Sequence, residues 1–229
     1  MTSEVFNIDC LEYMRTLPDN YFQLAIADPP YGSDIADNES QQQIIHATGT
    51  RFKRYESNGV KCPDWDLAPK QEFFDELFRV AQIVIIWGGN YFQLPPSRCI
   101  LCWDKKQPED FSMAMAEYAW TNMNSNAKIF RMSPQGNQKD PRFHPTQKPV
   151  ELYAWLLRNY AKPGDRIFDP MMGSQSSRIA AYKMVFDYVG CELDKEYFDK
   201  GCERFAKECK GEIKLKDGSI VKQASLFDL

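Results

Sequence analysis

Four consecutive residues, Asp28-Pro29-Pro30-Tyr31, combine a carboxylate, two prolines and an aromatic ring. Proline fixes its backbone torsion and donates no hydrogen bond, so these prolines can hold the Asp28 carboxylate and nearby carbonyls as a rigid cluster of acceptors. Such a cluster suits an amino group, which can donate one hydrogen to Asp28 and one to the Pro29 carbonyl. Tyr31 offers a face on which a base can stack. The alternative is a structural aspartate at a proline-stiffened strand end.

A second set of residues runs from Asp169 to Ser174 and includes Gly173, and Glu192 follows it. In a nucleotide-binding α/β unit, a glycine lets the chain pass close to a ligand after a strand. An acidic residue at the end of the next strand accepts hydrogen bonds from ribose hydroxyls. The three-glycine form that cradles phosphates is absent, so the pattern favours an adenosyl ligand without phosphates over a dinucleotide.

Both sets of residues follow predicted strands. Leu24 to Ala27 is a continuous apolar run, typical of a strand buried on both faces of a parallel sheet, and it leads directly into Asp28. Arg166 to Phe168 and Tyr188 to Cys191 are further predicted strands, separated by a helix from Ser176 to Met184. Because strands alternate with helices, we expect an α/β fold with a mostly parallel sheet and helices on both faces.

The length of 229 residues fits one domain, which we expect to span residues 1–210, with a tail over 211–229. Residues 32–69 are polar and aperiodic and predict a long loop. Residues 105–143 mix polar, basic and aromatic side chains with three prolines. This mixture predicts an inserted, surface-exposed subregion rather than sheet core.

The composition is that of an ordinary globular protein, with 43% hydrophobic and 26% charged residues. No apolar stretch is long enough for a membrane span and no signal peptide is recognisable, so we expect a cytoplasmic location. The seven cysteines are odd in number and scattered, which predicts reduced thiols. Cys99 and Cys102 lie in an apolar run without a second ligand pair, so we expect no metal site. The net charge of −4 is untypical of a nucleic-acid binder, although residues 105–148 are locally basic.

Three motifs occur in a fixed order: Asp28-Pro29-Pro30-Tyr31, then His144-Pro145-Thr146-Gln147-Lys148-Pro149, then Phe168-Asp169-Pro170-Met171-Met172-Gly173-Ser174. In this order the sequence resembles the beta-group DNA amino-methyltransferases, whose catalytic half precedes the cofactor half. The resemblance covers roughly residues 4–205. It implies a Rossmann-like, seven-stranded, mostly parallel sheet with one antiparallel strand.

The resemblance also implies a reaction and a site. The reaction is methyl transfer from S-adenosylmethionine to the N6 amine of a flipped adenine in double-stranded DNA. The catalytic residues would be Asp28, Pro29, Pro30 and Tyr31. The cofactor-binding residues would be Asp9, Thr146, Lys148, Asp169, Pro170, Met171, Gly173, Ser174 and Glu192. Asp9 is also placed to cap a helix, and it could do both.

Two positions depart from the family pattern. Met171 stands where the family has phenylalanine, and Gln175 stands where it has a second glycine. Methionine is an adequate apolar substitute, whereas glutamine could tighten a turn that glycine makes easily. The aspartate of the tetrapeptide favours adenine, because relatives that act on cytosine N4 more often begin it with serine.

DNA contacts and protein partners need further surfaces. The candidates for DNA contacts are basic residues of the long loop and of the 105–143 insert: Arg51, Lys53, Arg54, Lys128, Arg131, Lys139 and Arg142. The tail residues Gln223, Leu226 and Phe227 resemble a short peptide that docks on the bacterial sliding clamp. The alternative is that Leu226 and Phe227 cover the domain's own surface. Homodimers are common among similar enzymes.

Besides methylation of cytosine N4 in DNA, two other functions remain open. An amino-methyltransferase acting on RNA or on a protein glutamine can share a similar tetrapeptide, although its cofactor motif normally comes first. A DNA-binding relative without catalysis is the other, because the cofactor loop is altered at Met171 and Gln175.

Overall fold

The computed structural model describes residues 1–31, 68–108, 114–136, 143–144, 146–209, 212–214 and 220–222. Within these residues, eight strands form one sheet in the order β1-β8-β7-β2-β3-β5-β4-β6. In chain order they are β1 (Ser3–Phe6), β2 (Phe22–Ala27), β3 (Ala81–Trp87), β4 (Leu101–Asp104), β5 (Ala116–Thr121), β6 (Lys128–Arg131), β7 (Arg166–Asp169) and β8 (Asp187–Cys191). Only β5 runs against its neighbours in this sheet; the other pairings are parallel.

The mostly parallel sheet and its one reversed strand confirm the expected α/β fold, but the count of seven strands was too low. The outermost strand, β6, pairs with β4 alone. It is short, and its two ends are the exposed residues Lys128 and Arg131. An edge strand of this kind carries little apolar pattern, because only one of its edges and part of one face are covered.

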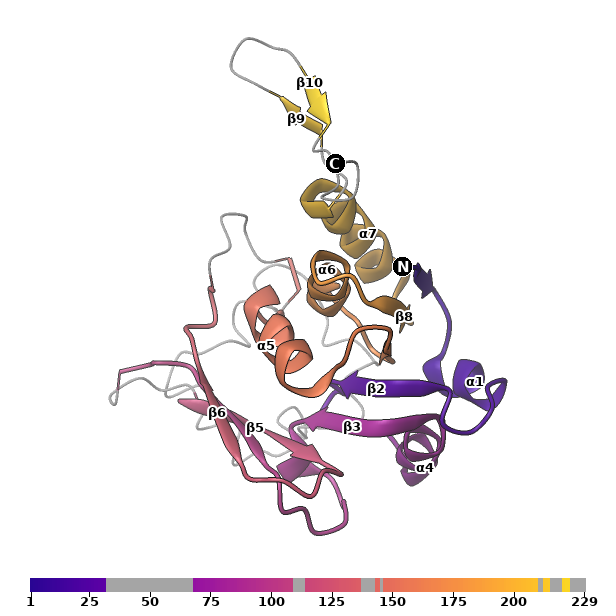
Figure 1. The fold of residues 1–229 in the computed structure, drawn as a ribbon, viewed down its shortest axis with the longest axis vertical. Coiled ribbons are helices and arrows are strands. Elements are labelled where there is room, and N and C mark those ends of the chain that lie inside the picture. The colour runs from indigo at the N-terminus through magenta and orange to yellow at the C-terminus, as the bar shows by residue number, and fades with distance from the viewer. Residues whose placement is uncertain are drawn as a thin grey trace, which may run out of the picture.

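Helices cover both faces of the sheet, as the sequence predicted. They are α1 (Cys10–Arg15), α4 (Gln71–Val80), α5 (Val150–Tyr160), α6 (Ser176–Lys183) and α7 (Lys195–Cys209), and a 3₁₀ turn, η2 (Gly89–Tyr91), follows β3. Figure 1 shows α5 and α6 on one side and α1 and α4 on the other. Leu24 and Ile26 of β2 pack in the core cluster that contains α5. Ala25 and Ala27 pack in the cluster that contains α4. Both faces of β2 are thus buried, which explains its unbroken apolar run.

Residues 105–143 were expected to form a surface subregion rather than sheet core, but they include β6 at the edge of the sheet and β5 in its interior, so the expectation was wrong for β5. This strand lies between β3 and β4, and its residues Ala119, Trp120 and Thr121 are buried. The strand is short and is flanked by polar residues, so its sequence resembles a surface segment. Its place in the sheet is set by antiparallel pairing with β3, more than 30 residues earlier in the chain.

Three acidic residues lie at the carboxyl ends of neighbouring strands of the sheet: Asp28, Asp169 and Glu192. Strand β2 pairs with β3 on one side and with β7 on the other, so the chain order reverses between β2 and β7. In open α/β sheets, ligands bind at the carboxyl ends of the strands on either side of such a switch point. Asp28 directly follows β2, Asp169 ends β7 and Glu192 directly follows β8.

Several sequence expectations fall outside the described residues. They concern most of the long loop 32–69 with Arg51, Lys53 and Arg54, residues Lys139 and Arg142, and the tail residues Gln223, Leu226 and Phe227. Within the tail, β9 (Glu212–Lys214) and β10 (Ile220–Lys222) form an antiparallel pair. No helix in the part of the chain described here has both the length and the apolarity to cross a membrane.

Candidate active site

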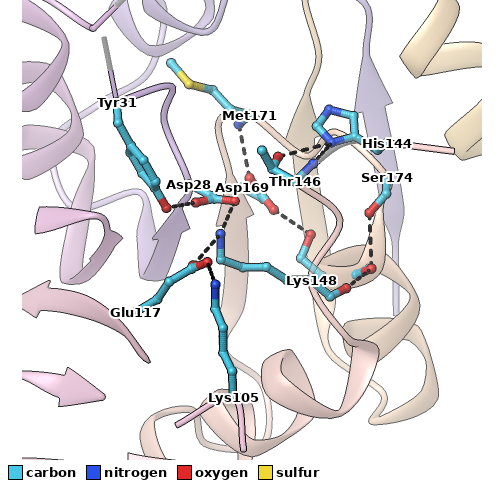
Figure 2. Close-up of polar contacts among 12 residues, drawn as sticks. Asp28, Tyr31, Lys105, Glu117, His144, Thr146, Lys148, Asp169, Met171 and Ser174 are labelled. Carbon is cyan, nitrogen blue, oxygen red and sulfur yellow. Dashed lines mark hydrogen bonds and ion pairs between the residues drawn. The ribbon is translucent and has the colours of Figure 1, made fainter. Parts of the chain in front are cut away.

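Asp28 is oriented by two donors at the end of β2. The prolines that follow it end the strand, because proline donates no hydrogen bond to a neighbouring strand. The Tyr31 hydroxyl donates to Asp28 Oδ1 at 3.0 Å, and Lys148 Nζ donates to Asp28 Oδ2 at 2.5 Å (Figure 2). The Asp28 side chain is 14% exposed. A carboxylate oxygen can accept more than one hydrogen bond, so Asp28 is held in place and can still accept from a ligand.

Lys148 brings three segments of the chain together. Its side chain is only 3% exposed, and its ammonium pairs with Asp28 and, at 3.2 Å, with Glu117 Oε2. The Lys148 carbonyl accepts a hydrogen bond of 2.7 Å from Ser176 at the start of α6. The Trp87 ring lies 5.7 Å from Nζ and supplies an apolar wall. A buried ammonium requires such carboxylate partners, because the loss of its hydration is otherwise uncompensated.

Glu117 is a site residue that the sequence did not reveal. It lies on β5 and joins two lysines, because its Oε1 is 2.6 Å from Lys105 Nζ and its Oε2 faces Lys148. Figure 2 shows the resulting row from Tyr31 through Asp28, Lys148 and Glu117 to Lys105. The signal in the sequence was a single carboxylate one residue from a buried Ala-Trp pair. That signal becomes informative only after β5 is placed in the sheet.

The charged groups of this row influence one another. Burial raises the pKa of Asp28 above its usual value, although the Lys148 ammonium opposes the shift. Burial would lower the pKa of Lys148, but Asp28 and Glu117 outweigh it and raise that pKa. Burial would raise the pKa of Glu117, but Lys148 and Lys105 outweigh it and lower that pKa to about 2. Glu117 and Lys148 therefore remain charged near neutral pH.

The Tyr31 ring is part of an aromatic surface. It stacks on Tyr91 of η2 with a centroid distance of 4.9 Å and an interplanar angle of 18°. It also packs against Gly88, where an added Cβ would lie 2.1 Å from a ring carbon of Tyr31. Gly88 has a φ of +67°, a conformation that glycine adopts at no steric cost. Tyr91, which is 61% exposed, was not foreseen as a neighbour of Tyr31.

The loop after β7 is ordered by its own hydrogen bonds. Asp169 accepts from the Met171 amide at 3.0 Å and from the Ser177 hydroxyl at 2.5 Å. Burial raises the pKa of Asp169 to about 7. The Ser174 hydroxyl lies 3.2 Å from that of Ser176. The carboxylate of Asp169 and the hydroxyl of Ser174 thus bond within this region, which gives them a part in shaping the loop.

Gln175 adopts a backbone conformation that glycine takes at no steric cost. Its φ is +59°, in the left-handed region. Its buried side chain donates to the Phe198 carbonyl at 3.2 Å and accepts from Arg178 at 2.9 Å. It also packs against Gly201, where a Cβ would lie 2.7 Å from it. The glutamine therefore makes the turn in a left-handed conformation and contacts α7.

Glu192 and Gly173 lie together at the ends of β8 and β7. The Gly173 amide donates to Glu192 Oε2 at 2.8 Å, and the Asp194 amide donates to Oε1 at 2.9 Å. Burial raises the pKa of Glu192. The His144 ring lies over Gly173, 3.1 Å from the position of an added Cβ. The segment that begins at His144 is thus in contact with the glycine loop.

Asp9 caps α1, as the sequence predicted. Its Oδ1 accepts from the Leu11 amide at 2.8 Å and from the Glu12 amide at 3.1 Å. It follows β1, which pairs in parallel with β8, so Asp9 and Glu192 both lie near the carboxyl ends of these two strands. Thr146 packs beside His144, with its hydroxyl 3.2 Å from the ring Nδ1.

Lys128 and Arg131 lie apart from this site. Both are on β6, four strands from β2, which corresponds to roughly 19 Å at the usual strand spacing. Lys128 donates to Asn159 at 2.8 Å, and Arg131 pairs with Asp104 at 3.3 Å. Their predicted contacts with DNA would therefore involve a surface away from Asp28.

The comparison with known families decides the class of this protein. A family model described as DNA methylase matches residues 69–203, more than half of the chain. The chain belongs to the DNA methylase family. The matched range of this methylase contains Glu117, Lys148, the β7 loop and Glu192, whereas Asp28 and its two prolines precede it.

Relatives of this methylase share most of its length. YubD of Escherichia coli (strain K12), which is named as a putative methylase, is 24% identical over 220 residues, covering 86% of this chain and 88% of YubD. The structure of TTHA0409 from Thermus thermophilus, complexed with S-adenosyl-L-methionine, has a TM-score of 0.55 and 17% identity and covers 92% of this chain and 97% of that one. The cytosine-N4-specific PvuII DNA methyltransferase has a TM-score of 0.56 and 13% identity, with 93% and 95% covered. At these identities the structural similarity shows the fold.

Proposed function

We propose that this DNA methylase transfers a methyl group from S-adenosylmethionine to the N6 amine of an adenine flipped out of duplex DNA. The observation that carries the proposal is the Asp28 carboxylate, which begins an Asp-Pro-Pro-Tyr sequence and is held by Tyr31 and Lys148. The amine of a paired adenine lies inside the duplex, so the base must leave the stack to reach this carboxylate.

Asp28 and Pro29 make the amine a better nucleophile. The lone pair of an exocyclic amine is delocalised into the ring, which makes the nitrogen weakly reactive. Asp28 accepts one amine hydrogen and the Pro29 carbonyl accepts the other, which favours a tetrahedral nitrogen with a directed lone pair. Stacking of the base on Tyr31 contributes about 1–3 kcal/mol. Holding the nitrogen in line with the methyl carbon supplies much of the acceleration. The C–S bond would break as the N–C bond forms, so S-adenosylhomocysteine would leave and the extra proton on the nitrogen would be lost to solvent.

The residues at the ends of β7 and β8 fit an adenosyl cofactor. S-adenosylmethionine supplies an electrophilic methyl group on a positively charged sulfur. Glu192 has a partly buried carboxylate suited to ribose hydroxyls, and Gly173 lets the chain approach closely where a Cβ would meet His144. Asp9, Gly173 and Glu192 would hold the adenosyl part, with Pro170 and Met171 beside it. Thr146 and Lys148 would face the methionine part, while Asp169 and Ser174 shape the loop.

The choice of adenine rests on the first residue of the tetrapeptide. Aspartate at this position is typical of relatives that act on adenine N6, whereas those that act on cytosine N4 more often have serine. Cytosine N4 is the second candidate, because it presents the same kind of amine and because PvuII, of similar fold, is specific for it.

The test is a product analysis. The purified protein is incubated with S-adenosylmethionine that carries a labelled methyl group, with duplex DNA, RNA and protein offered side by side. The DNA is then digested to nucleosides for mass spectrometry. We expect label in DNA as N6-methyldeoxyadenosine. Label as N4-methyldeoxycytidine would move the assignment to cytosine, and label in RNA or protein alone would overturn it.

The role of Asp28 is tested separately with Asp28→Ala. This variant should bind S-adenosylmethionine in calorimetry with an affinity like that of the native protein, because the cofactor residues are intact. It should transfer no methyl group to DNA. Retained transfer would refute the acceptor role of Asp28, whereas absence of cofactor binding in the native protein would indicate a relative without catalysis.

A further inference from the structure

Lys148 divides its ammonium between two carboxylates that are held differently. Its Nζ lies 2.5 Å from Asp28 Oδ2 and 3.2 Å from Glu117 Oε2. Glu117 Oε2 is buried and accepts no hydrogen bond from the described residues. Glu117 Oε1, in contrast, is fixed by Lys105 at 2.6 Å. The ammonium therefore lies beside a second acceptor with unused hydrogen-bonding capacity.

This division matters for an amine that must bind Asp28. A carboxylate bonded closely to an ammonium has less charge available for another donor. A short movement of Nζ from Asp28 toward Glu117 would restore that charge. It would cost little, because one carboxylate partner replaces another and the ammonium never becomes unpaired.

We infer that Glu117 is a positioning residue for methyl transfer, which takes over the Lys148 ammonium when the target amine bonds to Asp28. The inference rests on the proposed function. It assigns Glu117 a part in the reaction without contact to the base, because Glu117 acts through Lys148.

The Glu117 carboxylate is held rigidly, whereas the Lys148 side chain can move. Glu117 is on β5, where it pairs with Trp103 of β4, and its carboxylate is anchored by Lys105. Lys148 precedes α5, and its carbonyl is tied to Ser176, so its backbone is fixed while its four-carbon side chain can pivot. Two carboxylates and two ammoniums also leave the row electrically balanced, so the movement creates no net charge in the core.

The titratable groups that face Asp28 come from five segments. They are Tyr31 on its own loop, Glu117 on β5, Lys148 before α5, Tyr153 on α5 and Asp169 at the end of β7. The negative charge of Glu117 raises the pKa of Asp28. Removing that charge should therefore lower the pH at which Asp28 loses its ability to accept the amine.

The experiment compares Glu117→Gln with the native protein in a pH series of DNA methylation. We expect kcat to fall roughly tenfold to a hundredfold, because a neutral amide is a much weaker partner for the ammonium. KM for S-adenosylmethionine should stay within about twofold, because Lys148 keeps its ion pair with Asp28 in this variant and so keeps its place beside the cofactor. The acidic limb of the kcat profile should move to lower pH.

The matched control is Glu76→Gln. Glu76 has the same side-chain exposure of 23% and is also ion-paired, but with Arg79 on α4. Its variant should have native kcat and a native pH profile. Glu117→Asp keeps the charge at a shorter reach, so it should lower kcat and leave the acidic limb in place. This variant also decides the question if Glu117→Gln fails to fold.

Native kcat and pH profile in Glu117→Gln, or effects equal to those in Glu76→Gln, would overturn the inference. A loss of kcat with an unmoved acidic limb in Glu117→Gln would show a merely structural part and would overturn it as well. Asp28→Ala separates this outcome from failure of the proposed function. If Asp28→Ala is inactive while Glu117→Gln is native, only the part of Glu117 is refuted.

Discussion

Asp169 Oδ2 accepts a hydrogen bond of 2.5 Å from the Ser177 hydroxyl, which ties the end of β7 to the first turn of α6. The Asp169 side chain is buried, and its second oxygen accepts from the Met171 amide. One carboxyl group thus fixes both ends of the loop that contains Gly173. Because the Asp169 carboxyl group bonds to both ends of this loop, its protonation affects the whole loop.

Asp169 should make the stability of the protein depend on pH. Burial raises the pKa of Asp169 from 3.8 to about 7 in the folded state, so the folded protein binds the proton more tightly than the unfolded chain. Its contribution to the free energy of unfolding is therefore greatest below pH 4 and declines as the pH rises to about 7. The total change is on the order of 4 kcal/mol.

The measurement is urea unfolding of the native protein and of Asp169→Asn between pH 4 and pH 8. Asparagine can still accept from the Met171 amide but does not titrate. The native protein should lose stability relative to Asp169→Asn as the pH rises. A difference between the two that is constant across this range would contradict the raised pKa.

Gly88→Ala should disturb Tyr31 as well as the backbone. At a φ of +67° an alanine costs about 1–2 kcal/mol, and its Cβ would also lie 2.1 Å from the Tyr31 ring. Gly164→Ala is the matched control, because Gly164 has a φ of +91° and no atom within 4 Å of an added Cβ. Thermal unfolding should show a larger loss for Gly88→Ala, and only this variant should raise KM for DNA. Equal losses in the two variants would show that Tyr31 adapts without cost.

Lys148→Met should be strongly destabilising, by about 3–5 kcal/mol at neutral pH, because it leaves the partly buried Asp28 without a cation and leaves Glu117 with Lys105 alone. Without the ammonium the pKa values of both carboxyl groups rise, so protonation relieves the variant. The deficit measured by denaturant unfolding should therefore shrink between pH 8 and pH 5. Lys183→Met removes an exposed pair with Glu208 and should cost less than about 1 kcal/mol at either pH. A small deficit for Lys148→Met at pH 8 would refute the paired arrangement.

Two variants of Gln175 distinguish the effect of backbone strain on stability from the effect of lost side-chain contacts. Both Gln175→Gly and Gln175→Ala should destabilise the protein, because Arg178 loses an acceptor and a buried side chain is removed. Gln175→Gly should be the milder change by about 1–2 kcal/mol, because glycine adopts the left-handed conformation without steric cost. Chemical unfolding of the two variants checks this order. The reverse order would show that the position does not require a positive φ.

The elements next to Asp28 and Asp169 were predictable because their signals are local. A continuous apolar run followed by two prolines marks the end of β2, and a helix cap at Asp9 precedes α1. The alternation of strands and helices was sufficient for the α/β fold. These features depend on neighbouring residues, so a single sequence contains them.

Local signals in the sequence could predict neither the position of β5 in the sheet nor the contacts of Glu117. The direction of β5 is set by its pairing with β3 and β4, which are distant in the sequence. Lys148 was expected to face the cofactor, and its partners Asp28 and Glu117 come from strands that only the folded sheet brings together. The stacking of Tyr91 on Tyr31 likewise depends on the turn after β3.

The pairing of β1 with β8 has a consequence for how the chain is made. Strands β1 and β2 are consecutive in the sequence, yet β7 and β8 lie between them in the sheet. During synthesis the first strand must wait for its partner until residues 187–191 have left the ribosome. A nascent chain that stops before β7 exposes one edge of β2, and such long-range closure is slow and prone to association. We therefore expect the last third of the chain to determine when the growing polypeptide becomes resistant to proteases.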